Sequence, residues 1–457
     1  MSDGAMPNGY LRAGRSATAA VRDAATPPRL AALSSRRFGP LVLLLAVAGA
    51  APGVNADQPW GELVVAGRPA APAQFLGCTG DGSLRFDAGG DAPLAVDADA
   101  LVRWSTPAAS RGSEDLYLTD GSRIRLAPAW AGNRGWTVGA DVASITGHQL
   151  GDFQVPRERL LAMGLKLPPN EVERRRRIDE LLRRQSEHPA SDLLVLDNGD
   201  LLAGELKEAG GPPQVAVLHS EIGRLEVPLA RVSGIALAKG AGANTGTQPP
   251  RVPRILVGLG NGSLIAADSM AADGERVLLR SRSLGEVRVA AEEITSLQGF
   301  GECCEYLSQA TPIGYKHTPY LELPWSFTSD RNVLGGLLRV GGKTYLKGLG
   351  LHSASEITYA LDGRFDTFAA TIAVDDAAEG GGSIIARVLL QQDGGAWREA
   401  FASGVLRGGG AAVAASVPLA GAARLKLVVD YADRGDERDY ADWLDARLER
   451  TADDRSP

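Results

Sequence analysis

Cysteine is nearly absent from this sequence, and its scarcity excludes two classes of protein. The 457 residues include only three cysteines, Cys78, Cys303 and Cys304. A disulfide-built scaffold needs more of them, and their spacing matches no zinc site. At most one disulfide can form. Because a bond between adjacent cysteines is strained, that bridge would join Cys78 to Cys303 or to Cys304.

Aromatic residues are also scarce, at 5%, whereas glycine is abundant at 56 residues. This combination favours many short strands with tight turns over long helices, so we predict a mainly β fold. An apolar share of 44% with 23% charged residues excludes wholesale disorder. A chain of this length is too long for one ordinary core, so we expect about two to four domains.

Residues 1–56 have the features of an export signal. Six arginines precede the apolar run LVLLLAVAGAA, which ends near small residues where a signal peptidase would cut. The apolar stretch 38–54 is broken by two prolines and falls short of the roughly 20 residues that span a bilayer. Arg36-Arg37 is a faint twin-arginine signal, since Phe38 stands one place too early. We expect export to the periplasm, cell surface or exterior, with membrane attachment only if the segment stays uncleaved.

Acidic residues outnumber basic ones, 55 to 48, for a formal net charge of −7. Removing residues 1–56, which contain six Arg and two Asp, makes it −11. Such a surface repels nucleic acid, which we exclude as a partner. The basic run Arg174–Arg177 lies among acidic residues and is typical of a solvated helix face.

One pattern recurs through residues 57–300. Four segments, near residues 80, 119, 197 and 260, carry an Asp-Gly or Asn-Gly dipeptide, which favours a tight hairpin turn. Downstream segments from Leu150, Ile222 and Leu284 align without gaps, and residues 93–101 are the first segment's only counterpart. We predict four β-meander units, two in residues 57–167 and two in 190–300. They should stack, because none can bury its apolar face alone.

A helical insertion is predicted in residues 168–189, between the second and third units. Pro168 and Pro169 favour its start, and Pro189 follows its end. Its apolar positions recur at helical spacing: Val172, Ile178, Leu181 and Leu182. Residues 239–253 are rich in Gly and Pro and form a linker, and residues 301–319 are interpreted as a second linker.

No catalytic constellation stands out. The sequence offers no Ser/His/Asp order, phosphate loop, paired carboxylates in an aromatic setting or metal-ligand histidines above chance. Asp197 and Asp200 flank a turn, where Asp is favoured for its backbone hydrogen bonds. We therefore expect a protein that is not an enzyme, with repeats that act as scaffold or interaction surface.

The last third of the chain predicts an antiparallel β-sandwich over residues 320–450. Strand-like runs such as FDTFAATIAV, SIIARVLLQ and AARLKLVVDYA alternate with turns. The stretch VGGKTYLKGLGLHSASEITYAL, the later VDD, SGVL and GAARLKLVV, and the closing DYADWLDARL resemble the NPCBM module, a carbohydrate-binding module of family 98 glycoside hydrolases. The match covers about 130 residues in the family's order.

This resemblance implies a galactose-binding-like jelly roll that binds sugar, often of the galactose type, without catalysis. In the family, the histidine that corresponds to His352 lies near the loops of the sugar site, and the closing acidic and aromatic motif corresponds to Asp439, Ala441, Asp442 and Trp443. Tyr440 departs from the family, which more often has histidine there.

Sugar recognition needs an aromatic platform and directed polar groups. Trp325 and Trp443 are candidate platforms, and His352, Glu356 and Asp442 are candidate partners for hydroxyl groups. Each also has a structural interpretation: Trp325 and Trp443 can be structural or core residues, and His352, between Gly350 and Ser353, can cap a strand.

A structural calcium ion is a separate alternative, since hard oxygen ligands suit it. Its candidate ligands are Asp375, Asp376, Asp430, Asp433 and Asp436, although an ordinary solvated loop fits the same spacing. No cofactor is predicted.

Three functions remain open from the sequence. The first is a secreted carbohydrate-binding protein. The second is an envelope protein whose repeats and sandwich bind protein partners, which predicts an exposed apolar patch on the repeats. The third is a hydrolase with two facing carboxylates.

Overall fold

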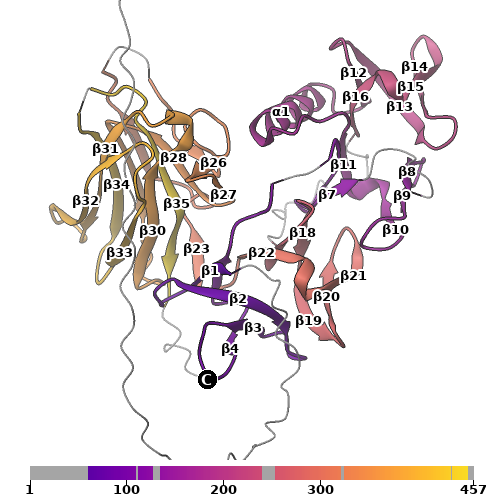
Figure 1. Cartoon of the computed structure of the whole chain (residues 1–457). Helices are drawn as coiled ribbons and strands as arrows, with labels where there is room; N and C mark the ends of the chain where they lie inside the picture. The colour runs from indigo at the N-terminus through magenta and orange to yellow at the C-terminus, as the bar shows by residue number, and fades with distance from the viewer. Residues whose placement is uncertain are drawn as a thin grey trace, which may run out of the picture. The chain divides into compact units, whose positions relative to one another are not determined.

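The computed structural model of the protein describes residues 60–109, 112–126, 134–238, 253–320, 324–433 and 435–450 (Figure 1). The expected signal segment and all but the last residue of the linker 239–253 lie outside these ranges. The described residues are mainly β strand with one α-helix, which confirms the predicted fold class. None of their helices is long and apolar enough to cross a membrane.

The β-repeat region contains four copies of one meander. The first comprises β1 (Gly61–Val65), β2 (Ala71–Cys78), β3 (Leu84–Asp87), β4 (Leu94–Val96) and β5 (Leu101–Trp104). The second comprises β6 (Glu114–Leu118), β7 (Arg123–Leu126), β8 (Gly135–Val138), β9 (Val142–Thr146), β10 (Phe153–Pro156) and β11 (Leu160–Gly164). The third comprises β12 (Asp192–Leu196), β13 (Leu201–Gly210), β14 (Val215–Ser220), β15 (Gly223–Pro228) and β16 (Val232–Ala236). The fourth comprises β17 (Ile255–Leu259), β18 (Leu264–Ala267), β19 (Ser269–Asp273), β20 (Arg276–Ser281), β21 (Gly285–Ala290) and β22 (Ile294–Gly299).

In every copy the last strand returns to pair with the first strand, as β16 does with β12 and β22 with β17. The second strand pairs with the first along its first half and then turns to pair with the third. In the second and fourth units this strand is divided into two pieces. A short 3-10 turn precedes the last strand in three units: η1 (Arg157–Arg159), η2 (Leu229–Arg231) and η3 (Ala291–Glu293).

The units join through their last strands, and not in the order of the sequence. β5 of the first unit pairs with β22 of the fourth, and β11 of the second pairs with β16 of the third. A single apolar core runs through the units; in the first, Phe75, Phe86 and Trp104 pack with ring centroids 5.4 to 6.0 Å apart. The Trp104 indole donates to the Ala73 carbonyl at 2.9 Å, so burial leaves its polar atom paired.

The four recurrent glycines occupy one turn conformation. Gly82, Gly121, Gly199 and Gly262 all have φ near 90° (89° to 90°), a conformation that side chains rarely adopt. In three units this turn joins the first strand to the second, whereas Asp81-Gly82 joins the second strand, β2, to the third, β3. Aligning the four units on this dipeptide alone therefore matches the second hairpin of the first unit with the first hairpin of the other three.

The predicted helical insertion is α1 (Glu171–Glu187), which begins after Asn170. The Asn170 side chain accepts from the Glu173 amide at 3.0 Å, a regular N-cap. The prediction that Arg174–Arg177 form a solvated face is wrong for Arg174, which is fully buried and donates to Asp115 at 3.0 Å. Val172, predicted on the apolar face, is 40% exposed.

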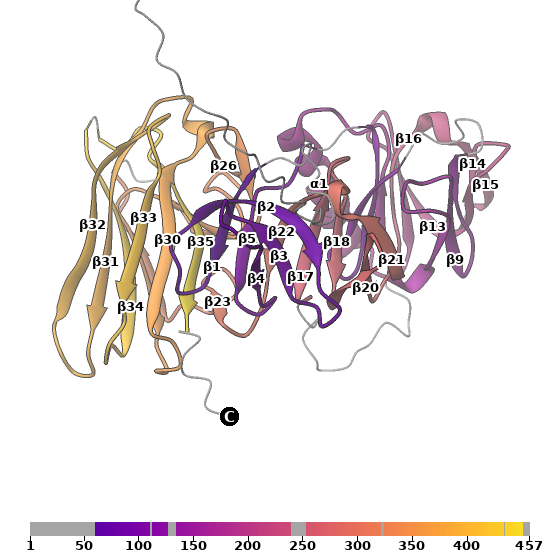
Figure 2. The same ribbon diagram turned by 60° about the horizontal axis from the view of Figure 1, so that its bottom comes forward.

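The C-terminal domain is a sandwich of two antiparallel sheets, whose strands run side by side in Figure 2. One sheet has the order β25 (Thr328–Ser329), β28 (Gly348–His352), β35 (Tyr440–Glu449), β30 (Thr367–Val374) and β33 (Val413–Pro418), with β23 (Cys304–Tyr306) also on β35. The other has the order β24 (Gly314–His317), β29 (Ser355–Ala360), β34 (Arg424–Tyr431), β31 (Ser383–Gln391) and β32 (Trp397–Arg407). The hairpin of β26 (Leu338–Val340) and β27 (Lys343–Tyr345) and the short η4 (Asp376–Ala378) complete the domain.

One sequence interpretation of this region is corrected. Residues 301–319 are not simply a linker, because they supply β23 and β24 to the two sheets. The single disulfide that the sequence allows is not formed among the described residues, where Cys78, Cys303 and Cys304 are buried thiols.

Candidate functional site

One end of the sandwich carries an aromatic cluster built by three loops. These loops connect β24 to β25, β28 to β29, and β34 to β35. Strand pairing fixes their starting points: His352 at the end of β28 pairs with Tyr440 at the start of β35, and His317 at the end of β24 pairs with Ser355.

Trp325 and His352 form the centre of this cluster. Their rings are stacked, 4.6 Å between centroids and 6° from parallel. His352 is only 3% exposed, whereas Trp325 is partly exposed above it. The imidazole therefore forms a base under a ring that still reaches solvent.

Trp325 lies outside any strand and is fixed by side chains from β24. Its backbone N–H donates to Nδ1 of His317 at 3.1 Å, and its carbonyl accepts from the Tyr315 hydroxyl at 2.7 Å. The His317 and His352 rings meet edge to face at 5.9 Å. The indole is thus held both through its ring and through its backbone.

Three tyrosines extend the aromatic surface. Tyr320 is 61% exposed and Tyr431 49% exposed, and their rings meet edge to face at 6.2 Å. Tyr440 lies 6.3 Å from Trp325 and 5.9 Å from His352. We call Tyr320, Trp325, His352, Tyr431 and Tyr440 the aromatic cluster. Exposed rings of this kind suit the apolar C–H face of a sugar.

A polar hollow lies on the other side of the β34–β35 loop, with a volume of about 530 Å³. Glycines 380–382 and Gly408 form part of its wall, together with Arg407, Asp433 and Arg438. Arg407 is paired with Asp433, and Arg438 contacts Glu379 at 3.1 Å. The loop end thus offers both stacking surface and charged hydrogen-bonding groups.

The structure brings together two of the five predicted site residues, Trp325 and His352. Glu356 is partly exposed in β29, where its carboxylate accepts from Lys426 Nζ at 2.6 Å. It contacts no member of the aromatic cluster among the described residues, and its charge is already matched.

Asp442 and Trp443 do not reach the surface of the sandwich. Both side chains are 0% exposed in β35, and Trp443 packs on Phe368 at 6.2 Å in the core. Burial, followed by the charge of nearby Asp375, holds the pKa of Asp442 well above its usual range. Trp443 is therefore corrected from platform to core residue, and Asp442 to a buried carboxyl.

Four of the five acidic residues considered for calcium have protein partners. Asp375 accepts from Asn332, Arg339 and Ala377, and Asp376 accepts from the amides of Gly341 and Gly342. Asp430 pairs with Arg387, and Asp433 pairs with Arg407. The described residues contain no group of His, Cys, Asp and Glu arranged to hold a metal ion.

Sequence reasoning missed His317, Tyr320 and Tyr431. Each stands at or just beyond a strand end, and these three residues are up to 114 positions apart in the chain. The sequence offered only one signal for these residues, an aromatic side chain beside a turn. This signal is weak until strand pairing shows which turns lie together.

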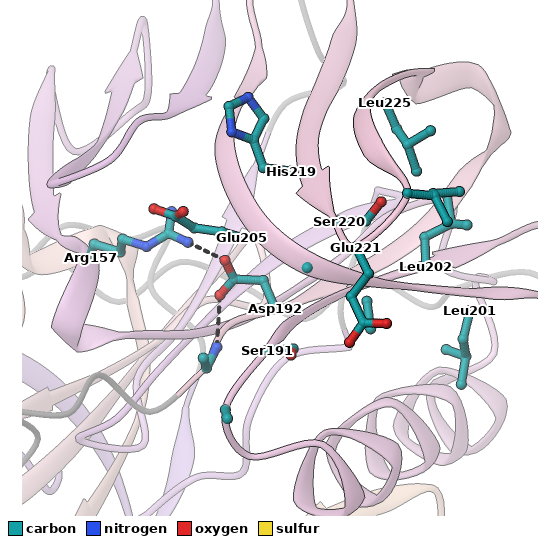
Figure 3. Close-up of a pocket in the computed structure, with 15 residues that line it drawn as sticks. Arg157, Ser191, Asp192, Leu201, Leu202, Glu205, His219, Ser220, Glu221 and Leu225 are labelled. Atoms are coloured by element: carbon teal, nitrogen blue, oxygen red, sulfur yellow. Dashed lines mark hydrogen bonds and ion pairs between the residues drawn. The ribbon is translucent and has the colours of Figure 1, made fainter.

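A second cleft, of about 690 Å³, lies in the third repeat unit (Figure 3). One wall is apolar, with Leu201, Leu202 and Leu225, next to Ile222, which is 84% exposed. On the other side, Asp192 accepts from Arg157 at 2.6 Å and from the Ala238 amide at 2.8 Å. Asp192 also accepts from the Leu206 amide, so it has a structural role and is not a free ligand.

The fold and the aromatic cluster together define a β-sandwich binding module. Residues 305–449 match the family model of the NPCBM/NEW2 domain. This part of the chain is therefore an NPCBM domain, which confirms the predicted resemblance and moves its start to residue 305.

Two curated relatives match part of this chain. The chain is 35% identical over 114 residues to a "Putative endo-alpha-N-acetylgalactosaminidase" of Renibacterium salmoninarum, covering 25% of this chain and 7% of the relative. It is 32% identical over 126 residues to Alpha-1,3-galactosidase B of Akkermansia muciniphila, covering 27% of this chain and 15% of the relative. The chain thus spans only a small part of either enzyme.

Solved carbohydrate-binding modules of Clostridium perfringens are also similar. A CBM51 module from GH95, in complex with methyl-galactose, shows 28% identity and a TM-score of 0.28, covering 32% of this chain and 99% of that chain. The CBM51-2 and INT domains of ZmpB, with GlcNAc bound to CBM51-2, show 21% identity and a TM-score of 0.29, covering 43% of this chain and 40% of that chain.

Proposed function

We propose that this protein is an exported, non-catalytic protein that binds galactose-type glycans through the aromatic cluster of its C-terminal sandwich. The observation that carries the proposal is the partly exposed Trp325 ring, which is stacked on buried His352 and lies 6.3 Å from Tyr440. A supported, partly exposed indole loses little conformational freedom when a sugar stacks on it.

The sugar class follows from the relatives. Both are named for enzymes that act on galactose or N-acetylgalactosamine linkages. The polar hollow of the same sandwich carries charged groups, which sugar recognition also uses.

A glycan array with the full chain tests the proposal. Galactose-terminated glycans should be retained, and Trp325→Ala should weaken binding about tenfold or more, the loss of one stacking contact. Trp397→Ala is the matched control, because Trp397 is also partly exposed but lies on β32, where it packs against Lys426. Equal loss in both variants, or retention of no glycan, would sink the proposal.

Export is tested separately by the N-terminus of the mature protein. Cleavage after Ala56 should leave Asp57 as the first residue of the secreted form. Full-length protein in the membrane fraction would instead indicate the uncleaved anchor.

A second candidate function, binding of a protein partner, is favoured by the cleft of the third repeat unit. Ile222 and Leu201 expose apolar surface beside that cleft, and such patches are typical of interaction sites. A photo-crosslinking side chain at Ile222 should give one discrete adduct in cells, while the same group at exposed Glu286 should give none. Identical patterns from both positions would remove this candidate.

A further inference from the structure

Trp325 has no strand to hold it, so its position depends on three side chains. His352 supports its ring, Tyr315 donates to its carbonyl, and His317 Nδ1 accepts its backbone N–H. Of these, only the bond to His317 depends on a protonation state that changes near neutral pH.

We propose that neutral His317 is the positioning residue of the sugar platform, and that protonation of His317 releases Trp325 and weakens glycan binding. This inference rests on the proposed function, which it deepens by naming how the same site responds to acid. It differs from a direct role in binding, because His317 acts through Trp325.

The hydrogen-bond geometry dictates the direction of the effect. Nδ1 accepts the Trp325 N–H, so in this arrangement it carries no proton and the neutral ring has its proton on Nε2. An imidazolium carries protons on both nitrogens. Nδ1–H would then point at another N–H, and the bond that holds Trp325 would become a repulsive contact.

His352 does not share this sensitivity. Its contact with Trp325 is face to face, and a protonated imidazole over an indole is attracted to the ring. Protonation of both histidines, whose rings are 5.9 Å apart, would add like-charge repulsion. Protonation of His317, and not protonation of His352, is therefore the event that displaces Trp325.

The groups that face the two histidines set the pH at which each histidine becomes protonated. Burial lowers the pKa of His317 and of His352 below the usual 6.5, while the Asp436 carboxylate, from the β34–β35 loop, favours their protonated forms. The hydroxyl groups of Tyr315 and Ser355 lie beside Trp325 and carry no charge near neutral pH. Nearby Asp439 is a second titrating group, since burial raises its pKa to about 6.

Fluorescence of Trp325 tests the positioning role without any sugar. The chain has seven tryptophans, so the signal is the difference between each protein and its Trp325→Phe counterpart, followed from about pH 8 to about pH 4.5. We expect one transition in the wild type, with its midpoint below 6.5. His317→Ala should show the displaced signal at every pH. His317→Asn should lack the transition that is due to His317, because its amide oxygen accepts like Nδ1 and does not titrate. Any change that remains comes from His352, whose ring is stacked on Trp325. Asp439→Asn should leave the transition in place.

Glycan affinity, measured over the same range, completes the test. Binding by the wild type should fall about tenfold or more through the Trp325 transition, and binding by folded His317→Asn should not change. A Trp325 signal that is independent of pH, or a His317→Ala variant that matches the wild type in signal and affinity, overturns the inference. If the transition is present but no glycan binds at any pH, the proposed function fails while the positioning of Trp325 by His317 stands.

Discussion

Polar side chains in the sandwich differ chiefly in how many of their polar atoms have a hydrogen-bond partner. Both carboxylate oxygens of Asp375 accept hydrogen bonds, whereas both carboxylate oxygens of fully buried Asp442 lack a hydrogen-bond partner among the described residues. A carboxyl in that position favours its protonated form.

Asp442→Asn should therefore stabilise the protein at neutral pH. The folded state raises the pKa of Asp442, so its contribution to stability is greatest in acid and is lost as pH rises through the unfolded and then the folded pKa. The wild type should lose more stability than the Asn variant between about pH 4 and about pH 8 in denaturant titrations. Asp430→Asn, on the partly exposed Arg387 pair, is the control and should not show this difference.

Trp443 and Trp325 should respond oppositely to truncation. Trp443→Ala should lower the free energy of unfolding by about 3–5 kcal/mol, because it leaves a cavity beside Phe368 in the sandwich core. Trp325→Ala should cost much less stability but lose glycan binding. Chemical denaturation measures the stability of both variants, and the glycan array measures their binding. A Trp443→Ala variant that stays stable but no longer binds glycans would show that Trp443 belongs to the site.

The site was only partly predictable for a reason visible in β35. Nine of its ten residues are buried, so the strand shows no alternation of exposed and buried positions. Without alternation, Asp442 and Trp443 could not be assigned to a face. His352 was found through the family resemblance, and Trp325 was found as an aromatic residue that can form a platform for a sugar.

At the scale of single elements, α1 shows how a charge pattern misleads. Its four consecutive arginines, 174–177, predict a solvated face, yet the 3.6-residue period turns Arg174 inward with Ile178, Leu181 and Gln185. There Arg174 meets Asp115, itself fully buried and also paired with Arg125 at 3.0 Å. Only the position of β6 beneath the helix makes this arginine a core residue.

Arg174→Met should destabilise the protein by about 3 kcal/mol, the low end for a broken buried pair, because Arg125 still pairs with Asp115. Arg177→Met is the matched control: its pair with Glu173 is exposed, so the change should stay within about 0.5 kcal/mol. Equal losses in thermal or chemical unfolding would show that α1 is held by something other than the buried ion pair.

Turns were the most predictable elements, and linkers the least. An Asp-Gly or Asn-Gly dipeptide fixes a positive φ locally, so all four hairpins form where predicted. Residues 301–319 lack such a signal. β23 exists because the last residues of β35 extend beyond β28, and β24 exists because β29 has an open side, which no local pattern reveals.

Across the whole molecule, the three thiols should behave as one buried class. Burial raises the pKa of Cys78 and of Cys304 to about 12, which keeps these thiols protonated and unreactive. A thiol reagent at about pH 8 should label none of the three in the native protein and all three in denaturant without reductant. Only one reactive thiol in denaturant would show that one disulfide is formed after all.

The sequence by itself determined the mainly β class, the hairpin turns, the helix between Pro169 and Pro189, and the family of the sandwich. These depend on preferences carried by a few adjacent residues. Only the tertiary structure decided that the first repeat unit joins the fourth, that Arg174 is buried, and that Trp325 rests on His352, 27 residues away. Strand pairing and burial are long-range, so they depend on which distant surfaces meet and not on the residues beside them in the chain.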